Sequence, residues 1–151
     1  MKAEFIERFT HFVDWPDSAF ASASSAFVVC VWGRGPLAAQ LEQVVTRAPI
    51  KGRAVRVLHV ESRERIPPCH ILYVATHEPT VVRDIVASTR GKPILSIGDQ
   101  PGLAEEGLLI NLVLDQEGFV RFEINLDVAR ISGLKISAKL MRLARRVGTR
   151  R

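Results

Sequence analysis

The chain has 151 residues, a formal net charge of +5 and 47% hydrophobic residues. This length and composition are typical of one ordinary globular domain and exclude a disordered or fibrous protein. No apolar run approaches the roughly 20 residues of a membrane-spanning helix, so the sequence predicts none.

The start of the chain predicts an amphipathic helix and leaves the cellular location open. Residues 1–6 lack the basic, apolar and small-residue regions of a secretion signal, so the protein either stays inside the cell or has lost a leader. Phe5, Phe9 and Phe12 recur at helical spacing and predict a helix over 2–13, which ends before Pro16.

Strands and helices alternate through the middle of the chain. The nearly unbroken apolar run over 26–32 is typical of a strand that is buried on both faces. The elements predicted after it are, in chain order, a helix over 37–46, an edge strand over 53–60, a strand over 69–75, a helix over about 80–88 and a short strand over 93–97.

The last third of the chain predicts a hairpin followed by two capped helices. Strands over 108–114 and 119–124 are joined by four residues that include Gly118. Asn125 is placed to cap a helix over 126–131 that stops at Gly133, and Ser137 is placed to cap a final helix reaching Val147.

Together these elements predict a single α/β domain over residues 1–151. We expect a three-layer sandwich with a mixed, mainly parallel sheet of five to six strands that ends in an antiparallel hairpin. A basic tail occupies about 148–151.

Residues 139–151 contain six basic residues and no acid. A solvated helix face with a frayed tail accounts for this pattern, and a nucleic-acid or anionic membrane surface is the alternative. Aromatic residues that stack on bases are not interleaved with these arginines, so we expect no nucleic-acid partner.

Catalytic signatures are weak throughout the sequence. Gly33-Arg34-Gly35-Pro36 follows a strand and opens a helix, but the third glycine of a dinucleotide site is missing. We interpret it as a plain turn, with a weak ligand contact through Arg34 as the alternative. The histidines lack metal-ligand spacing and no G-x-S-x-G motif occurs, so we expect no enzyme activity, metal or cofactor.

Cys30 and Cys69 fall in predicted strands that commonly lie side by side in doubly wound sheets. Neighbouring strands are about 4.8 Å apart, which is close enough for a disulfide if both side chains face the same way. Two buried free thiols are the equally acceptable alternative.

The chain as a whole resembles the YfiR family of small periplasmic bacterial regulators. The segments that carry this resemblance, all in the family's order, are Lys2-Ala3, Phe9, 12–16, 29–33, Pro36-Leu37, 51–53, 69–73, 121–125, 133–137 and Lys139-Leu140.

The resemblance implies a periplasmic repressor without enzyme activity whose signal peptide is absent from this sequence. Its expected target is an inner-membrane diguanylate cyclase, contacted through the cyclase's periplasmic domain. An outer-membrane, peptidoglycan-binding lipoprotein is expected to sequester the repressor, so that cyclic di-GMP rises and biofilm forms. A homodimer is also possible for a member of this family.

The resemblance also implies roles for particular residues. It implies a disulfide between Cys30 and Cys69, whereas the second bridge found in some members has no cysteines here. It places lipoprotein contacts at Ile110, Glu123 and Ile131, for which core packing or a solvated strand face are the alternatives. A second hypothesis is a small-molecule sensing domain with ligand contacts near Arg34 and Lys135.

Overall fold

The computed structural model describes residues 2–150. Its elements are, in chain order, α1 (Lys2–Phe9), β1 (Val13–Asp14), the 3₁₀ helix η1 (Asp17–Ala19), β2 (Phe27–Trp32), α2 (Pro36–Val45), β3 (Val55–Val60), β4 (Ile71–Val74), α3 (Pro79–Thr89), β5 (Leu95–Gly98), α4 (Leu103–Glu106), β6 (Ile110–Leu114), β7 (Val120–Asn125), α5 (Leu126–Ser132), β8 (Lys135–Ile136), α6 (Ala138–Leu143) and β9 (Arg145–Val147).

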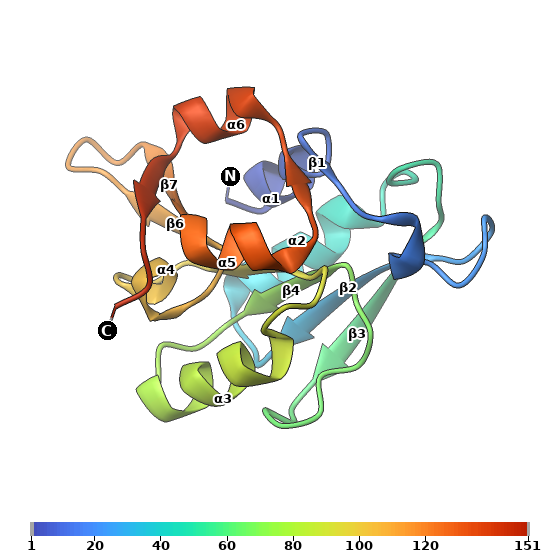
Figure 1. Ribbon diagram of the computed structural model, residues 1–151, viewed down its shortest axis with the longest axis horizontal. Coiled ribbons are helices and arrows are strands. Elements are labelled where there is room, and N and C mark those ends of the chain that lie inside the picture. The colour runs from blue at the N-terminus through green and yellow to red at the C-terminus, as the bar shows by residue number, and fades with distance from the viewer. Residues whose placement is uncertain (1, 151) are drawn as a thin grey trace.

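The main sheet has the strand order β3-β2-β4-β5-β6-β7-β9. The five strands β2, β3, β4, β5 and β6 are parallel to one another. Strand β7 is antiparallel to β6, and β9 runs parallel to β7. The strand order reverses between β2 and β4, which is the topological switch point of a doubly wound sheet. Strands β1 and β8 form a separate antiparallel pair (Figure 1).

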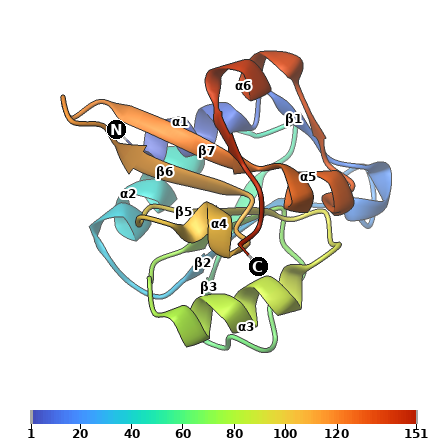
Figure 2. The same ribbon diagram turned by 60° about the vertical axis from the view of Figure 1, so that its left-hand side comes forward.

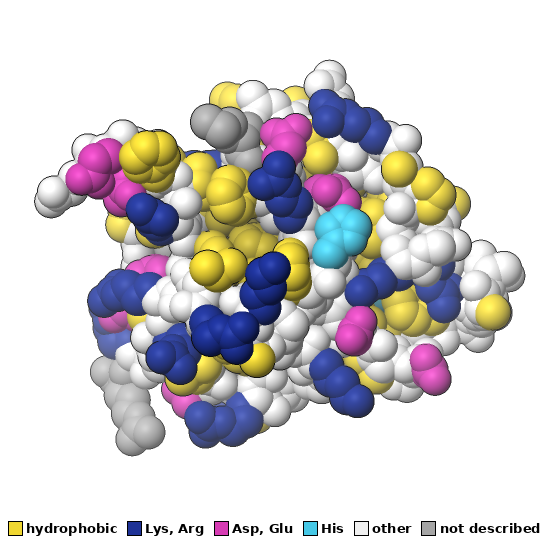
Figure 3. All heavy atoms as spheres, turned by 90° about the horizontal axis from the view of Figure 1, so that it is seen from above, with side chains coloured by type: hydrophobic (Ala, Val, Ile, Leu, Met, Phe, Trp, Pro, Cys, Tyr) yellow, Lys and Arg dark blue, Asp and Glu magenta, His cyan; other side chains and the backbone are white. Residues whose placement is uncertain are grey.

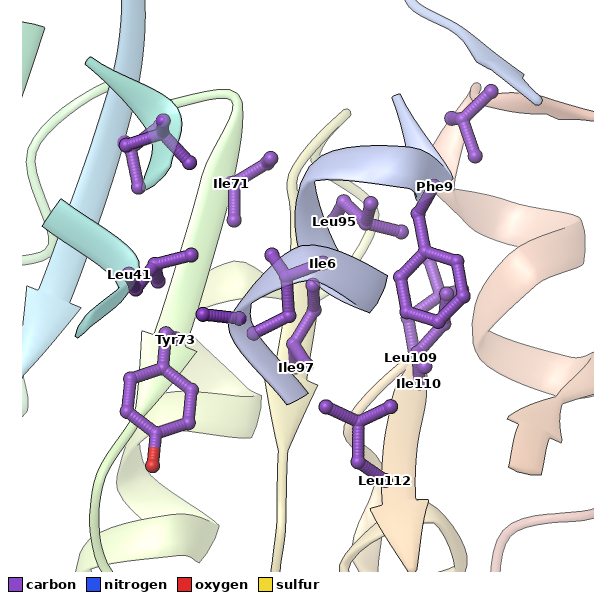
Figure 4. Close-up of a cluster of buried hydrophobic side chains, with 14 of the residues drawn as sticks. Ile6, Phe9, Leu41, Ile71, Tyr73, Leu95, Ile97, Leu109, Ile110 and Leu112 are labelled. Carbon is purple, nitrogen blue, oxygen red and sulfur yellow. The ribbon is translucent and has the colours of Figure 1, made fainter. Parts of the chain in front are cut away.

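Helices cover both faces of the sheet, which confirms the three-layer α/β sandwich. One core cluster joins α1 and α2 to the sheet, and a second cluster joins α3 and α4 to the opposite face. In the first cluster Ile6 and Phe9 of α1 lie over the central strands (Figure 4). All four residues of β4 are buried, as expected of a strand covered on both sides.

The end of the chain differs from the prediction. Residues 145–147 form β9, so the final helix is shorter than predicted and the sheet gains a seventh strand. The apolar spacing of residues 140–147 suits a helix, but the backbone becomes extended at Ala144 and pairs with the free edge of β7. The pairing of residues 145–147 with β7 therefore overrides the helical preference of the local sequence.

The first helix is also shorter than predicted, because the backbone after it is used for strand pairing. Helix α1 ends at Phe9, and Val13 and Asp14 pair with Ile136 and Lys135. This small sheet ties the N-terminal end of the chain to the segment between α5 and α6.

The predicted caps are confirmed. The side-chain oxygen of Asn125 accepts a hydrogen bond from the Val128 N–H, and that of Ser137 accepts one from the Leu140 N–H. Gly133 ends α5 with φ of 82°, a left-handed conformation that favours glycine.

The basic tail is attached to the domain as far as the structure describes it. The Thr149 N–H donates to Asp127 Oδ2 at 2.9 Å, and the Arg150 guanidinium pairs with Glu105 and Glu106. These contacts replace the frayed tail that was predicted, while Arg151 lies outside the described residues. Among residues 2–150, no helix combines the length and apolar character needed to span a membrane.

Candidate functional site

The C-terminal segment (residues 119–150) carries most of the large apolar side chains that are exposed. Phe119, Ile131 and Leu143 are 62%, 46% and 68% exposed. Figure 3 shows hydrophobic side chains on the face that carries α1, α6 and the β6–β7 hairpin, interspersed with lysines and arginines. An exposed apolar surface among charged residues is typical of a site of protein contact.

Glu123 lies within this segment, but its carboxylate is not open to solvent. The residue is 6% exposed, and its carboxylate forms a hydrogen-bonded ion pair with Arg145 of β9, its register partner across the two strands. The Arg145 side chain is 70% exposed. The surface here therefore presents a guanidinium that is held in place by a buried acid.

Ile110 is a core residue, which corrects its assignment as a contact residue. It is fully buried, pairs with Ile124 and lies among the side chains covered by α1 (Figure 4). It has no surface to offer a partner in this conformation. Of the three residues assigned to partner contact, only Ile131 is exposed.

Arg34 and Lys135 lie at opposite ends of β4. Gly33, next to Arg34, approaches Ala75 after the end of β4. Lys135 is the strand partner of Asp14 in the β1–β8 pair. The next residue, Trp15, donates its indole N–H to the carbonyl of His70, which precedes β4, so Lys135 lies near the beginning of β4. Four strand residues span roughly 13 Å, so the structure does not bring the two cations to one ligand.

A hollow of about 370 Å³ lies at the carboxyl ends of β2, β4 and β5, beside Arg34. The Tyr73 hydroxyl donates to Asp99 Oδ1 at 3.1 Å, and Lys2 Nζ lies 3.6 Å from Asp99 Oδ2. Burial, and then the negative charge of Asp99, raise the pKa of Tyr73. Ligands of open parallel sheets bind at this position, outside the strand ends at the switch point.

Cys30 and Cys69 are brought together, as the strand prediction required. Strands β2 and β4 are direct neighbours, and both side chains are buried in the cluster between the sheet and α3. Both are free thiols in this structure. A hydrogen bond with Cys30, together with burial, raises the pKa of Cys69. The bridge itself stays a prediction, but the two sulfur atoms face each other.

His70 turns away from Cys69 and belongs to an aromatic cluster on the other side of the sheet. Its Nδ1 accepts the Val28 N–H at 2.9 Å, so the ring proton is on Nε2, which donates to the Ala19 carbonyl at 2.8 Å. The ring stacks on Phe20 and Phe27 with centroids 4.2 and 5.0 Å apart. Burial lowers the pKa of His70, which keeps the ring neutral.

No group of three or more metal-ligating side chains comes together within residues 2–150. Sequence reasoning missed the Tyr73–Asp99–Lys2 contact, because its members come from three distant segments. The signal that was available is the position of Tyr73 and Asp99 at the carboxyl ends of two predicted parallel strands.

A comparison with solved structures shows a shared fold. One similar structure is the ligand-free, open structure of CD0873, a substrate binding protein with adhesive properties from Clostridium difficile. The TM-score is 0.58 and the identity 12%, with 88% of this chain and 57% of that chain covered. This chain thus spans a little over half the length of that protein.

A comparison with family models identifies the family. The model described as YfiR/HmsC-like (DUF4154) matches residues 1–145, nearly the whole chain. The match agrees with the ordered motifs that run from Lys2 to Leu140. The chain belongs to the YfiR/HmsC-like family.

Proposed function

We propose that this protein is a non-enzymatic periplasmic repressor of an inner-membrane diguanylate cyclase. It binds the periplasmic domain of the cyclase and is itself sequestered by an outer-membrane, peptidoglycan-binding lipoprotein, so that the two partners compete for it. The observation that carries the proposal is the family match over residues 1–145, which supports a periplasmic regulatory role in cyclic di-GMP signalling.

The exposed apolar side chains of the C-terminal segment support contact with a protein. Single exposed apolar residues are common, but here three large ones come from β7 and its flanking hairpin, α5 and α6 within about 30 residues of chain. Arg142 is exposed on α6 and lies one residue from Leu143. Arginine is among the residue types that contribute most of the binding energy at protein interfaces.

We assign the lipoprotein contact to Ile131 and to the Arg145–Glu123 pair. Ile131 offers an apolar anchor, and Arg145 offers a guanidinium to an acidic or carbonyl group of the partner. Glu123 acts through Arg145, because its own carboxylate is buried beneath it. Ile110 then contributes only by packing under β7.

A homodimer would use the tip of the β6–β7 hairpin. Leu114 and Phe119 are 58% and 62% exposed there. In this proposal Phe119→Ser makes a concentration-dependent dimer monomeric in sedimentation velocity, without changing the folded spectrum. A wild-type protein that sediments as a monomer at all concentrations contradicts this part.

The proposal is tested by titrating the purified protein against the isolated periplasmic domain of a diguanylate cyclase from the same organism. Leu143→Asp is expected to weaken binding to the cyclase domain at least tenfold, and Ile131→Asp is expected to weaken binding to the lipoprotein at least tenfold. Each variant loses an apolar anchor worth about 1.4 kcal/mol or more. Thr80→Asp, an exposed change in the first turn of α3, is the matched control. A folded wild-type protein that binds neither partner contradicts the proposal.

The hollow beside Arg34 favours a second candidate function, a periplasmic small-molecule sensing domain. Its polar lining includes the Tyr73–Asp99–Lys2 contact and Arg34, whose guanidinium lies 3.7 Å from the exposed Glu61 and is 92% exposed. A thermal-shift screen with small polar metabolites tests this candidate. A stabilising compound should lose its effect in Arg34→Ala and keep it in Arg83→Ala, which changes an exposed arginine of α3 outside this hollow.

A further inference from the structure

A second cavity, of about 390 Å³, lies on the α3 side of the sheet and has no part in the surfaces assigned above except for Ile131. It is bounded by the end of α3, by α5 and by Thr149 at the C-terminal end of the described chain, which are seen together in Figure 2. We propose that this cavity binds a small amphipathic organic anion, whose apolar body enters the cavity and whose carboxylate is held at the mouth by arginine.

The walls of the cavity are apolar. Val86 of α3, Ile94 before β5, and Val128 and Ile131 of α5 line it. Gly107 brings the backbone close to Val86, since a Cβ at Gly107 would lie 2.6 Å from a Val86 methyl group. These walls favour a hydrocarbon body over a sugar or a nucleotide.

The floor of the cavity offers one hydrogen-bond donor. Ser96 of β5 is 3% exposed, and its hydroxyl oxygen accepts the Leu109 N–H at 2.9 Å. No residue in the range 2–150 accepts the hydroxyl proton of Ser96, although backbone carbonyls accept the protons of the other buried hydroxyls of this cavity, Thr89 and Ser132. The Ser96 hydroxyl therefore keeps its single donor available for a ligand in the cavity.

The mouth of the cavity is positively charged. Arg90, Lys92 and Arg130 line it, and neither guanidinium group forms a hydrogen bond or ion pair with another described residue. The lining holds a single acid, Asp127, whose Oδ2 accepts the Thr149 N–H, so basic residues outnumber acids three to one. Two unpaired guanidinium groups next to an apolar cavity match a carboxylate, which arginine binds with two parallel hydrogen bonds.

The volume limits the size of the occupant. Small-molecule sites in proteins span about 300–1,000 Å³, so this cavity lies at the small end of that range. It accommodates a medium-chain or monocyclic carboxylate and not a folded partner. Thr149 lines the cavity, so a bound anion would also contact the C-terminal end of the described chain.

The test uses octanoate as the probe and follows the backbone amide resonances of ¹⁵N-labelled protein during a titration. Saturable shifts are expected at Val86, Arg90, Val128, Ile131 and Thr149. Octanamide, which has the same chain but no charge, is expected to bind at least tenfold more weakly, because it cannot form charge-assisted hydrogen bonds with the arginines.

Two double variants locate the carboxylate. Arg90→Gln/Arg130→Gln is expected to reduce octanoate affinity at least tenfold, whereas Arg65→Gln/Arg83→Gln, which has the same charge but leaves the cavity intact, is expected to bind as the wild type does. Equal binding of octanoate and octanamide, unchanged affinity in the first variant, or no saturable shifts at millimolar octanoate would each overturn the proposal. The amide spectrum of each variant shows whether it has folded, and none of these readouts depends on a cyclase or lipoprotein.

Discussion

In the parallel half of the molecule, from β2 to β6, the central strands are buried between two layers of helices. The C-terminal segment instead consists of short elements that leave large apolar side chains exposed to solvent. All residues of β4 and β5 are buried. By contrast, α5 and α6 have seven and six residues and expose Ile131 and Leu143. The comparison separates a part that stabilises the domain from a part that is available for contacts.

The two parts are joined by a few specific interactions. Asn125 is fully buried at the boundary, where its side-chain amide donates to the Ala104 carbonyl at 2.7 Å and to Thr149 Oγ1 at 2.9 Å. The β1–β8 pair makes a second connection. These links hold the C-terminal segment in one orientation relative to the rest of the sheet.

The largest effect on stability is expected in the parallel half. Ile97→Ala removes a fully buried side chain of β5 and should lower the free energy of unfolding by about 2–5 kcal/mol. Leu143→Ala should change it by no more than about 0.5 kcal/mol, because that side chain is 68% exposed. Urea unfolding measures both. Similar losses in the two variants would contradict the division into a core part and a contact part.

A disulfide between Cys30 and Cys69 is also expected to stabilise the parallel half of the molecule. A disulfide that closes this loop of about 40 residues contributes about 4 kcal/mol in the chain-entropy model. Protein exported to the periplasm should show no titratable thiol when denatured without reductant, and its denaturation midpoint should fall when reductant is added. Two free thiols in the exported protein, or an unchanged midpoint, would refute the bridge. Cys30→Ala/Cys69→Ala controls for effects of the reductant elsewhere.

A smaller effect is expected where the two halves meet. Asn125→Ala removes the cap of α5 and one of the two hydrogen bonds to the Ala104 carbonyl, which keeps the Gly107 N–H as its other donor. The expected cost is about 1–3 kcal/mol. Ser137→Ala, which removes only the cap of α6, should cost about 1 kcal/mol. Amide hydrogen exchange should accelerate through residues 126–150 in Asn125→Ala. Unchanged protection there would show that the cap does not join the two parts.

The smallest and most pH-dependent effect is expected at His70. Because burial lowers its pKa in the folded state, the unfolded chain takes up a proton that the folded chain excludes once the pH falls below about 6.5. The contribution of His70 to stability is therefore complete above that pH and decreases as the pH falls further. His70→Phe should flatten this acid-side slope, and His11→Gln, a change at an exposed histidine, should preserve it. An equal slope in wild type and His70→Phe would contradict the assignment.

The sequence predicts the parallel half better than the C-terminal segment, for a physical reason. Buried strands and capped helices leave local patterns, as at 26–32, Asn125 and Ser137, and these predictions are confirmed. The pairing of β9 with β7 and of β1 with β8 involves two or three residues that are distant in sequence, so no local pattern reveals it. The burial of Glu123 escaped prediction for the same reason, whereas core packing was the alternative stated for Ile110.

The two cavities could not be predicted from local sequence patterns either. Ser96, Arg90 and Arg130 are unremarkable in the sequence and become a candidate site only when β5, α3 and α5 are placed together. The Tyr73–Asp99–Lys2 contact likewise joins three segments. Alternation and spacing identify elements, whereas sites formed between elements depend on topology.

The central claim is that this YfiR/HmsC-like protein acts by touching a diguanylate cyclase, and the direct measurement is cyclase turnover. Membranes that contain the full-length cyclase are supplied with GTP, and cyclic di-GMP formation is followed while purified protein is added from the periplasmic side. The account predicts a saturable fall in turnover that Leu143→Asp weakens and Thr80→Asp does not. Unchanged turnover in the presence of an excess of folded wild-type protein would contradict it.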